Sequence, residues 1–355
     1  MTETANATAP SGSKPPLEQQ PVLVINDLVK HFTVKGGPFQ RQAGKVLAVD
    51  GVSFELARGE TLGIVGESGC GKSTTARVLM RLMAPDSGEV MINGQQVDSP
   101  SGISVRDMRY LMQMVFQDSY ASLNPRMTIE ETIAFGPRAQ GVPLAQARER
   151  ARDILGRVGL DPNLFIRRYP HELSGGQRQR VNIARALALE PEIVILDEAV
   201  SALDKSVEAQ VLNLLMDLKE QLNLTYIFIS HDLNVVHYVS DRVLVMYLGK
   251  VVEIGSVEEI YSETAHPYTR ALLSAMPSMD PGNRAEEPPI SGDPPNPIDP
   301  PTGCRFHTRC AYAEGLCSKV EPSLHVVSNK PNHFSACHMN IPNSGHSAAP
   351  TGDAA

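Results

Sequence analysis

The chain has 355 residues, of which 42% are apolar and 20% charged, and its formal net charge is −8. This composition provides enough apolar mass for a core and excludes collagen-like, coiled-coil and wholly disordered classes. The acidic balance argues against a general affinity for nucleic acid, and no apolar run approaches the ~20 residues that a membrane span needs, so we expect a folded, soluble, cytoplasmic chain.

The first residues differ in composition from the rest. Residues 1–20 are polar, rich in Ala, Pro, Ser, Thr and Gln, and carry no basic-then-apolar secretory pattern, so we expect a disordered leader and a fold that begins near Pro21. Residues 35–45 are turn-rich and basic and separate two short apolar runs, which predicts an exposed hairpin loop between two strands.

From residue 61 to residue 260, short β-branched runs alternate with longer helical patterns. This alternation is typical of an α/β protein with a mostly parallel sheet. The strand candidates are residues 61–65, 193–196, 226–229 and 242–247. The clearest helix places apolar side chains along one face, at Val207, Val211, Leu214, Leu215, Leu218 and Leu222.

A glycine-rich loop follows the first of these strands and precedes a helical pattern. Residues 66–73 match the spacing G-x-x-x-x-G-K-[ST], in which backbone N–H groups and the positive helix end cradle a polyphosphate. Lys72 is expected to bind phosphate oxygens and Ser73 to bind Mg²⁺. An ordinary glycine turn with a stray lysine is the alternative, which the full spacing disfavours. The expected phosphate-binding residues are Gly66, Glu67, Ser68, Gly69, Cys70, Gly71, Lys72, Ser73 and Thr74, with Cys70 as a spacer.

An acidic pair ends the strand candidate at residues 193–196. Asp197 is suited to hold Mg²⁺ directly or through water, and Glu198 is the candidate base that orients a water in line with the leaving oxygen. Many strands end in acidic turns, so the pair becomes a strong signal only together with the glycine-rich loop.

Residues 173–177, Leu-Ser-Gly-Gly-Gln, precede a second helical pattern, with Ser174 placed as its N-cap. Here the chain resembles the ATP-binding cassette (ABC) family, in which these residues would be the signature motif. The resemblance implies ATP contacts from Ser174, Gly175, Gly176, Gln177 and, in the D-loop at residues 201–204, Asp204. It also implies that Phe32 stacks on adenine, that Gln117 is the Q-loop glutamine, which helps to bind Mg²⁺, and that His231 is the switch histidine. Without the surrounding motifs, Gln117 would be interpreted as a polar surface residue, and His231 as a histidine at a strand end whose hydrogen bonds are made within the fold.

The family's fold and mechanism follow from the same resemblance. It implies a P-loop NTPase cassette of the α/β class, with a RecA-like mixed sheet and a helical subdomain at about residues 118–190, inside an ATPase domain at residues 21–276. In this family two cassettes pair head to tail, so that the loop around Lys72 in one and residues 174–177 in the other enclose one ATP. ATP would then favour a closed dimer and hydrolysis would release it.

Residues 48–54, 123–129, 266–273 and 303–307 are similar to those of ATPase subunits of bacterial dipeptide and oligopeptide importers. This likeness implies a peripheral subunit at the cytoplasmic face of the membrane. Its partners would be a second ABC ATPase subunit, often a different one, two transmembrane permease subunits and, through the permease, an extracytoplasmic peptide-binding protein, with no nucleic acid. The region from Gln117 to about residue 136 would seat a coupling helix of the permease.

Two other functions are compatible with a cassette. A soluble ABC ATPase acting on nucleic acid or ribosomes would carry a long coiled-coil insertion or two cassettes. This chain has about a hundred residues between Lys72 and Leu173 and one cassette. An importer ATPase for nickel or another small solute stays open, because substrate choice belongs to the other subunits.

The C-terminal part begins with a proline-rich stretch. Residues 277–301 hold nine of the 27 prolines, which predicts a stiff, extended connector at residues 277–302. A small unit at residues 303–340 follows. Beyond Asn340 the sequence returns to Ser, Gly, Ala and Pro, so we expect a disordered tail at residues 341–355.

Four cysteines lie in this small unit, at Cys304, Cys310, Cys317 and Cys337. Structural zinc usually involves a cysteine pair two to four residues apart, which is missing here, whereas four thiolates at wider spacing can hold an iron–sulfur cluster. The resemblance implies a [4Fe–4S] cluster, because peptide-importer subunits carry one at this motif. Zinc and free thiols, including thiols that sense redox state and gate the ATPase, stay open, and His307, His333 and His338 are possible substitute ligands.

Overall fold

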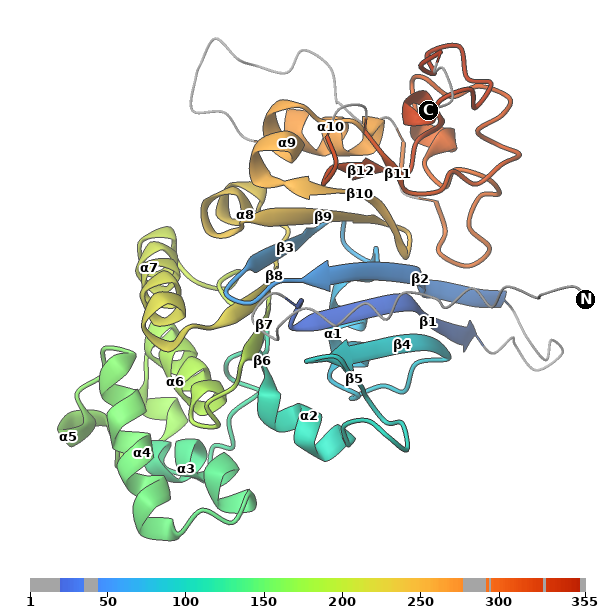
Figure 1. Ribbon diagram of the computed structural model, residues 1–355. Helices are drawn as coiled ribbons and strands as arrows, with labels where there is room; N and C mark the ends of the chain where they lie inside the picture. Colours follow the sequence, from blue (N-terminus) through green and yellow to red (C-terminus); the bar gives the residue numbers. More distant parts are fainter. Residues whose placement is uncertain (1–19, 35–43, 277–291, 294, 328–329, 352–355) are drawn as a thin grey trace, which may run out of the picture.

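The structure, a computed structural model, describes residues 20–34, 44–276, 292–293, 295–327 and 330–351. Its centre is an eight-stranded sheet with the order β11-β12-β10-β9-β3-β8-β7-β6 (Figure 1). Strands β9, β3, β8, β7 and β6 are parallel, whereas β10, β12 and β11 continue the sheet in antiparallel pairings. The strands are β3 (Thr61–Val65), β6 (Met112–Val115), β7 (Ile193–Asp197), β8 (Thr225–Ile229), β9 (Arg242–Tyr247), β10 (Lys250–Ser256), β11 (His325–Val326) and β12 (Phe334–Ser335).

A second, antiparallel sheet covers one face of the first. Its order is β2-β1-β4-β5, and its strands are β1 (Leu23–Val34), β2 (Gly44–Leu56), β4 (Ser87–Ile92) and β5 (Gln95–Gln96). Strands β1 and β2 pair from Leu23 opposite Leu56 to Val34 opposite Gly44, which confirms the two predicted strands. The tip of the hairpin loop expected at residues 35–45 lies outside the described residues.

The main sheet is buried on both faces, which explains why its strands read as unbroken apolar runs. Side chains alternate between the faces along a strand. In β7, Ile193 and Ile195 join the core beneath the antiparallel sheet, whereas Val194 and Leu196 join the core beneath the helices. All four predicted strands are present, two with identical bounds and two longer by one residue.

Helices cover the remaining surfaces. Helix α7 (Lys205–Leu222) is the amphipathic helix that the sequence predicts, and it buries Val211, Leu215 and Leu218. The other helices of the cassette core are α1 (Lys72–Leu79), α2 (Val105–Leu111), α8 (Leu233–Val239), α9 (Val257–Ser262) and α10 (Pro267–Ser274). Among the described residues no helix is long and apolar enough to cross a bilayer.

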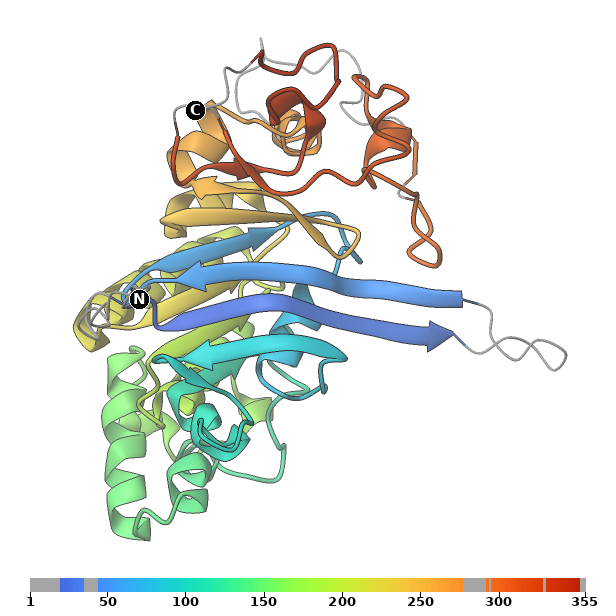
Figure 2. The same ribbon diagram turned by 45° about the vertical axis from the view of Figure 1, so that its right-hand side comes forward.

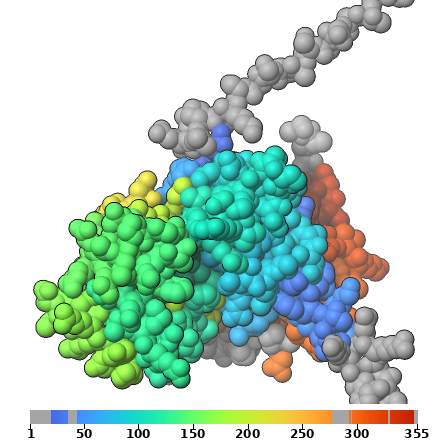
Figure 3. Space-filling model, turned by 90° about the horizontal axis from the view of Figure 1, so that it is seen from below, coloured from blue at the N-terminus to red at the C-terminus, as the bar shows by residue number. Residues whose placement is uncertain are grey.

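A helical lobe extends from the β6 end of the main sheet. It contains α3 (Ile129–Ala139), α4 (Leu144–Arg157), α5 (Pro162–Phe165) and α6 (Gly175–Leu187), within the range 118–190 expected for a helical subdomain. A capping box starts α3: Thr128 Oγ1 accepts the Glu131 N–H, and the Glu131 carboxylate accepts the Thr128 N–H. Viewed from below, the green helical lobe lies beside the teal and blue antiparallel part (Figure 3).

The C-terminal unit lies at the opposite end of the molecule, against the β10 edge of the main sheet (Figures 1 and 2). Strand β12 pairs with β10 through Glu253 opposite Ser335 and Ile254 opposite Phe334. The connector at residues 277–302 falls partly outside the described residues, and of its described part Ile298 forms an isolated bridge with Val46 of β2.

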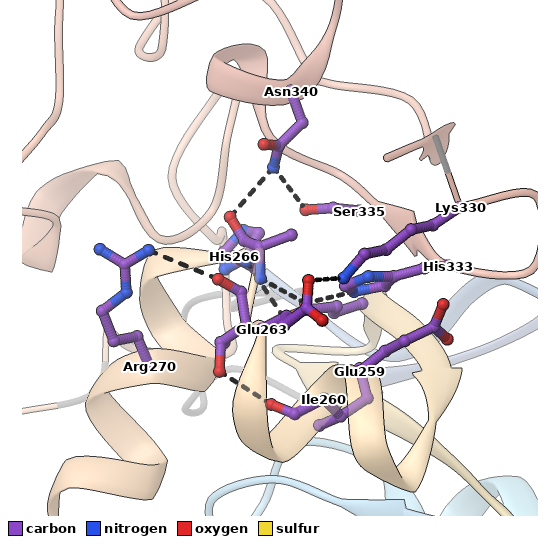
Figure 4. A network of polar contacts seen from close by, with 12 residues as sticks. Glu259, Ile260, Glu263, His266, Arg270, Lys330, His333, Ser335 and Asn340 are labelled. Atoms are coloured by element: carbon purple, nitrogen blue, oxygen red, sulfur yellow. Dashed lines mark hydrogen bonds and ion pairs between the residues drawn. The ribbon is translucent and has the colours of Figure 1, made fainter. Parts of the chain in front are cut away.

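A buried polar network fixes this docking (Figure 4). Glu253 of β10 is fully buried and accepts hydrogen bonds from the N–H groups of Ala265 (2.7 Å) and His266 (3.1 Å). His333, also fully buried, places Nε2 2.8 Å from the same carboxylate. Asn340 then donates to Ala265 O and Ser335 Oγ, at 3.0 and 3.1 Å.

The described part of the tail differs from the disorder expected at residues 341–355. His346 is 7% exposed, and its Nε2 lies 3.0 Å from Tyr312 O. The N–H of Ser347 donates to the Glu314 carboxylate. His346 also lines the small cavity that the four cysteines share, a contact that composition alone does not reveal.

Candidate nucleotide site

A cavity of about 700 Å³ lies at the carboxyl ends of the parallel strands of the main sheet. Strands β3, β6, β7 and β8 are parallel, so their carboxyl ends meet there, as ligand sites do in open α/β sheets. Each strand is followed within two residues by a residue that the sequence analysis singled out: Gly66, Gln117, Glu198 and His231. The lining residues are Phe32, Val46, Ala48, Ser68, Gly69, Gly71, Lys72, Ser73, Thr74, Gln117, Glu198 and His231.

The loop after β3 requires glycine at two positions. Gly66 has φ +148°, and a Cβ there would lie 2.2 Å from Met246 O. Gly71 has φ +112°, and its Cβ would lie 2.0 Å from Ala48 O. These close approaches turn the chain so that α1 begins at Lys72, beside the cavity, where its positive N-terminal end favours an anion.

Lys72 is buried and held by its own loop. Its Nζ donates to Gly66 O at 2.7 Å and to Glu67 O at 3.1 Å. The neighbouring Cys70 is 3% exposed, and burial raises the pKa of its thiol, so it stays protonated near neutral pH. An inert, buried Cys70 agrees with the spacer expected from the sequence.

Two oxygen ligands suitable for Mg²⁺ lie side by side. Ser73 Oγ donates to Asp197 Oδ1 at 2.7 Å, and Asp197 is 2% exposed at the end of β7. Burial raises the pKa of Asp197, an effect that the Ser73 hydrogen bond partly offsets. A hydroxyl and a carboxylate at the mouth of a phosphate-binding loop fit the donor preference of this ion.

Three polar side chains converge next to this pair. Gln117 Nε2 donates to Glu198 Oε2 at 2.7 Å, and His231 Nδ1 lies 3.5 Å from the same oxygen. Glu198 has φ +48°, a conformation that costs a non-glycine residue energy and occurs at functional sites. Its N–H donates to Ile229 O, so β8 holds the backbone of Glu198 while its carboxylate lines the cavity. The arrangement can orient a water and exchange a proton with it.

An aromatic ring forms the opposite wall. Phe32 comes from β1 of the antiparallel sheet and is 36% exposed. Lys30 Nζ lies 5.7 Å from the centre of its ring. An exposed ring beside a phosphate-binding loop can stack on a flat heterocycle.

The expected signature residues do not line this cavity. Ser174 is exposed at the start of α6, where its Oγ accepts the Gln177 N–H at 3.3 Å and its own N–H donates to Gln177 Oε1 at 3.0 Å. The N-cap predicted at Ser174 is confirmed, whereas the reciprocal bond from Gln177, which the spacing Ser-x-x-Gln signals, was not predicted. Asp204 is the N-cap residue of α7 and also lies outside the cavity.

Glu67 also differs from the expectation that it lines the phosphate-binding cavity. Its side chain contacts the C-terminal unit, where Arg309 Nη1 and Nη2 lie 2.8 and 3.0 Å from its two carboxylate oxygens. Sequence analysis missed Arg309, because nothing in a sequence pairs residues 242 positions apart.

The four cysteines of the C-terminal unit line one small cavity together. Burial raises the pKa of Cys304 to about 11 and that of Cys337 to about 12, while the Tyr312 N–H donates to Cys310 Sγ at 3.4 Å. Within the described ranges, no three His, Cys, Asp or Glu side chains are arranged to hold a metal ion.

The three histidines considered as substitute ligands have other partners. His307 Nδ1 lies 2.8 Å from Cys304 O, and His338 Nε2 lies 2.9 Å from Val320 O. His333 binds Glu253 in the docking network and does not line the cysteine cavity.

Comparisons with known proteins agree with this geometry. The family model "ABC transporter" matches residues 49–201, and "Oligopeptide/dipeptide transporter, C-terminal region" matches residues 252–317. The oligopeptide transport ATP-binding protein AppF of Bacillus subtilis is 49% identical over 325 residues, which are 90% of this chain and 98% of that protein. The di/tripeptide transport ATP-binding protein DppF of Pseudomonas aeruginosa is 47% identical over 319 residues, 89% of this chain and 97% of that one.

Among solved structures, cbiO1 of Clostridium perfringens has a similar fold. The TM-score is 0.58 at 28% identity, and the match covers 69% of this chain and 92% of that one. It is described as part of the ABC transporter complex cbiONQ.

Proposed function

Because the chain belongs to the ABC transporter ATP-binding proteins of oligopeptide and dipeptide importers, we propose that it hydrolyses ATP to drive import of short peptides through a membrane permease. The observation that carries the ATPase part is the convergence of Lys72, Ser73, Gln117, Glu198 and His231 on one cavity. The peptide part rests on relatives that span nearly the whole chain and are described as peptide transporters.

Each side chain then has a physical task. Phe32 stacks on the adenine ring, and the N–H groups of the glycine-rich loop bind the phosphates. Lys72 moves from its backbone acceptors onto the β- and γ-phosphate oxygens. Glu198 orients the attacking water, and Gln117 and His231 hold its carboxylate in place and contact the γ-phosphate side.

Mg²⁺ bound to ATP would neutralise charge that develops on the phosphates. Ser73 and Asp197 are the residues that would hold it, since Ser73 lines the cavity and its hydroxyl is hydrogen-bonded to the Asp197 carboxylate behind it. Gln117, two residues after β6, is the third expected ligand.

A second cassette completes the site. Ser174 is exposed and, with residues 175–177, lies outside this chain's own cavity, so these residues are free to face ATP held by a partner. ATP between the two surfaces favours a closed dimer, and its hydrolysis lets the dimer open, which moves an attached permease. We propose a different subunit of the same family as the partner, two permease subunits, and a peptide-binding protein reached through the permease.

We propose that the permease binds the helical lobe, and that the chain thereby lies at the cytoplasmic face of the membrane. Residues 117–136 carry two large, exposed apolar side chains, Tyr120 and Phe135, at 58% and 64% exposure. Tyr120 lies in the segment before α3 and Phe135 in α3 itself, and we propose that these exposed apolar groups contact the permease.

Two variants test the ATPase. Glu198→Gln removes the water-orienting charge but leaves the phosphate cradle, so it should bind ATP, accumulate closed dimers and lose most of the turnover. Lys72→Ala should lose ATP affinity. Glu190→Gln, the same chemical change on the far side of the molecule, is the control and should behave as wild type in equilibrium binding and steady-state ATPase assays. Near-wild-type turnover of Glu198→Gln would contradict the assigned role.

The substrate class needs a separate measurement. In a strain that lacks the chain, uptake of a labelled dipeptide or oligopeptide should return with the wild-type chain and not with Glu198→Gln. Restored uptake of nickel without any effect on peptides would reject the peptide assignment while leaving the ATPase in place.

We also propose that the four cysteines hold a [4Fe–4S] cluster with a structural role. The four cysteines line one small cavity, and a cluster would have to draw their sulfurs together, because within the described residues they are not yet arranged as a metal site. The Tyr312 N–H already donates to Cys310 Sγ, a contact that cluster sulfurs also accept. Protein purified without oxygen should be brown, and Cys310→Ser should abolish the visible absorption. A colourless protein with stoichiometric zinc would decide for zinc instead.

A further inference from the structure

The C-terminal unit contacts the phosphate-binding loop directly, through Arg309. This side chain is only 6% exposed, and it binds both oxygens of Glu67 in the parallel geometry that arginine and carboxylate prefer. Tyr247 supports it from the side, with Oη 3.3 Å from Nη1 and the ring centre 6.0 Å from the guanidinium carbon. Arg309 directly precedes Cys310.

Glu67 is fixed at three points. Arg309 binds its carboxylate, its N–H donates to Tyr268 Oη at 2.9 Å, and its carbonyl oxygen accepts from Lys72 Nζ at 3.1 Å. Glu67 therefore supplies one of the two backbone oxygens that hold Lys72, the other being Gly66 O.

The stretch between Cys304 and Cys310 is itself anchored. Arg305 donates to Leu248 O and to the Asp50 carboxylate. Phe306 is 3% exposed and packs on Tyr247 and Tyr268, with ring centres 5.4 and 5.3 Å apart. The same two tyrosines support Arg309 and Glu67, so the cysteine unit and the phosphate-binding loop share one packed contact.

We propose that Arg309 is a positioning residue of the nucleotide site: by neutralising and fixing Glu67 it sets the ATP affinity of the phosphate-binding loop, and it makes that affinity depend on an intact cysteine unit. This inference rests on the proposed ATPase function. Arg309 does not line the nucleotide cavity, so it acts only through Glu67.

The sign of the effect follows from charge. Without Arg309, the Glu67 carboxylate has no counter-charge beside a loop that must accept a triphosphate, and it competes for Lys72. ATP binding should weaken by about tenfold, the size expected for one charge at short range that water largely screens. Turnover at saturating ATP should stay within about twofold, because Gln117, Glu198 and His231 are untouched.

A double-mutant cycle tests this. The variants are Arg309→Gln, Glu67→Gln and the pair together, with ATP affinity measured by equilibrium titration and KM and kcat by ATPase assay. Arg309→Gln should raise Kd and KM and keep kcat, whereas the double variant should recover most of the affinity, because the uncompensated carboxylate is gone. Lys330→Gln is the matched control, since Lys330 also ties the C-terminal unit to the cassette, through Glu263, far from the loop.

The outcomes separate the two claims. Wild-type protein that fails to bind ATP would remove the proposed function itself. If wild type binds ATP and Arg309→Gln binds it equally well, the inference is wrong. It is also wrong if the double variant stays as weak as Arg309→Gln, since Arg309 would then act through folding rather than charge.

The dependence on the cysteine unit has its own readout. Cys310→Ser should raise the ATP Kd of wild type but change that of the Arg309→Gln variant little, because the connection is already broken. Equal increases in both backgrounds would overturn the claim that Arg309 transmits the state of the unit.

Discussion

Single residues in the nucleotide loop act mainly through backbone geometry. Gly71 combines a φ of +112° with a space in which a Cβ would collide with Ala48 O. Because glycine has no Cβ, the loop can adopt the conformation in which its backbone N–H groups face the phosphates. We therefore expect Gly71 to be as important for ATP binding as Lys72.

Gly71→Ala should therefore reduce both ATP binding and stability. The left-handed backbone alone costs about 1–2 kcal/mol, and the collision adds to it. Gly141→Ala separates the two effects, because Gly141 also has a positive φ, +91°, but open space around its Cβ position. Denaturant unfolding should show a loss of about 1 kcal/mol for Gly141→Ala, with ATP binding retained. ATP binding by Gly71→Ala equal to that of Gly141→Ala would contradict this account.

A second residue-scale prediction concerns pH. His266 is 1% exposed at the start of α10, where its Nδ1 accepts the Tyr268 N–H, and burial lowers its pKa to about 4. The unfolded chain takes up a proton near pH 6.5, whereas the folded chain does so only near pH 4. The free energy of unfolding should thus fall as pH drops from 6.5 towards 4, by up to about 3 kcal/mol from this group.

His266→Asn is the control for that measurement. Asparagine keeps an N-cap acceptor for α10 but does not titrate. Its unfolding free energy should depend less on pH between 6.5 and 4 than that of wild type. Identical slopes in denaturant titrations at several pH values would show that His266 is not the responsible group.

At the scale of elements, much of the core could be predicted from sequence. Strands β3, β7, β8 and β9 are buried on both faces and rich in β-branched residues, so their composition marks them. These strands also predicted the location of the site, because the carboxyl ends of parallel strands lie on the same side of a sheet and bring the residues that follow them together. Motif spacing singled out Lys72 and Glu198, which line the cavity, and Asp197, which is bound to Ser73 of the lining, and their roles in the chemistry stay predictions.

Elements that depend on distant partners were not predictable. Strand β12 has two residues, which pair with β10 on one side and with β11 on the other. The ion pair of Glu67 with Arg309 depends on two charges that look ordinary in their local sequences. Composition suggested a disordered tail, yet His346 is ordered by a contact with Tyr312.

At the scale of the whole molecule, the helical lobe and the C-terminal unit form separate surfaces at two ends of the chain's fold. They lie at opposite ends of the main sheet (Figures 1 and 2). The residues that follow β3, β6, β7 and β8 line the nucleotide cavity. Ser174 and Asp204 lie outside the cavity that holds Lys72. In the proposed dimer, each chain would contribute two half-sites, and the partner cassette would complete each of them.

The pairing of β12 with β10 bears on how the C-terminal unit could be removed. A chain cut after α10 would leave Glu253 and Ile254 of β10 without their partners in β12. It would also strip the cover from the Glu253 carboxylate. Exposed edges of this kind recruit strands from other molecules. The truncated chain should therefore self-associate through this exposed edge. Point substitutions are a better way than deletion to study the C-terminal unit.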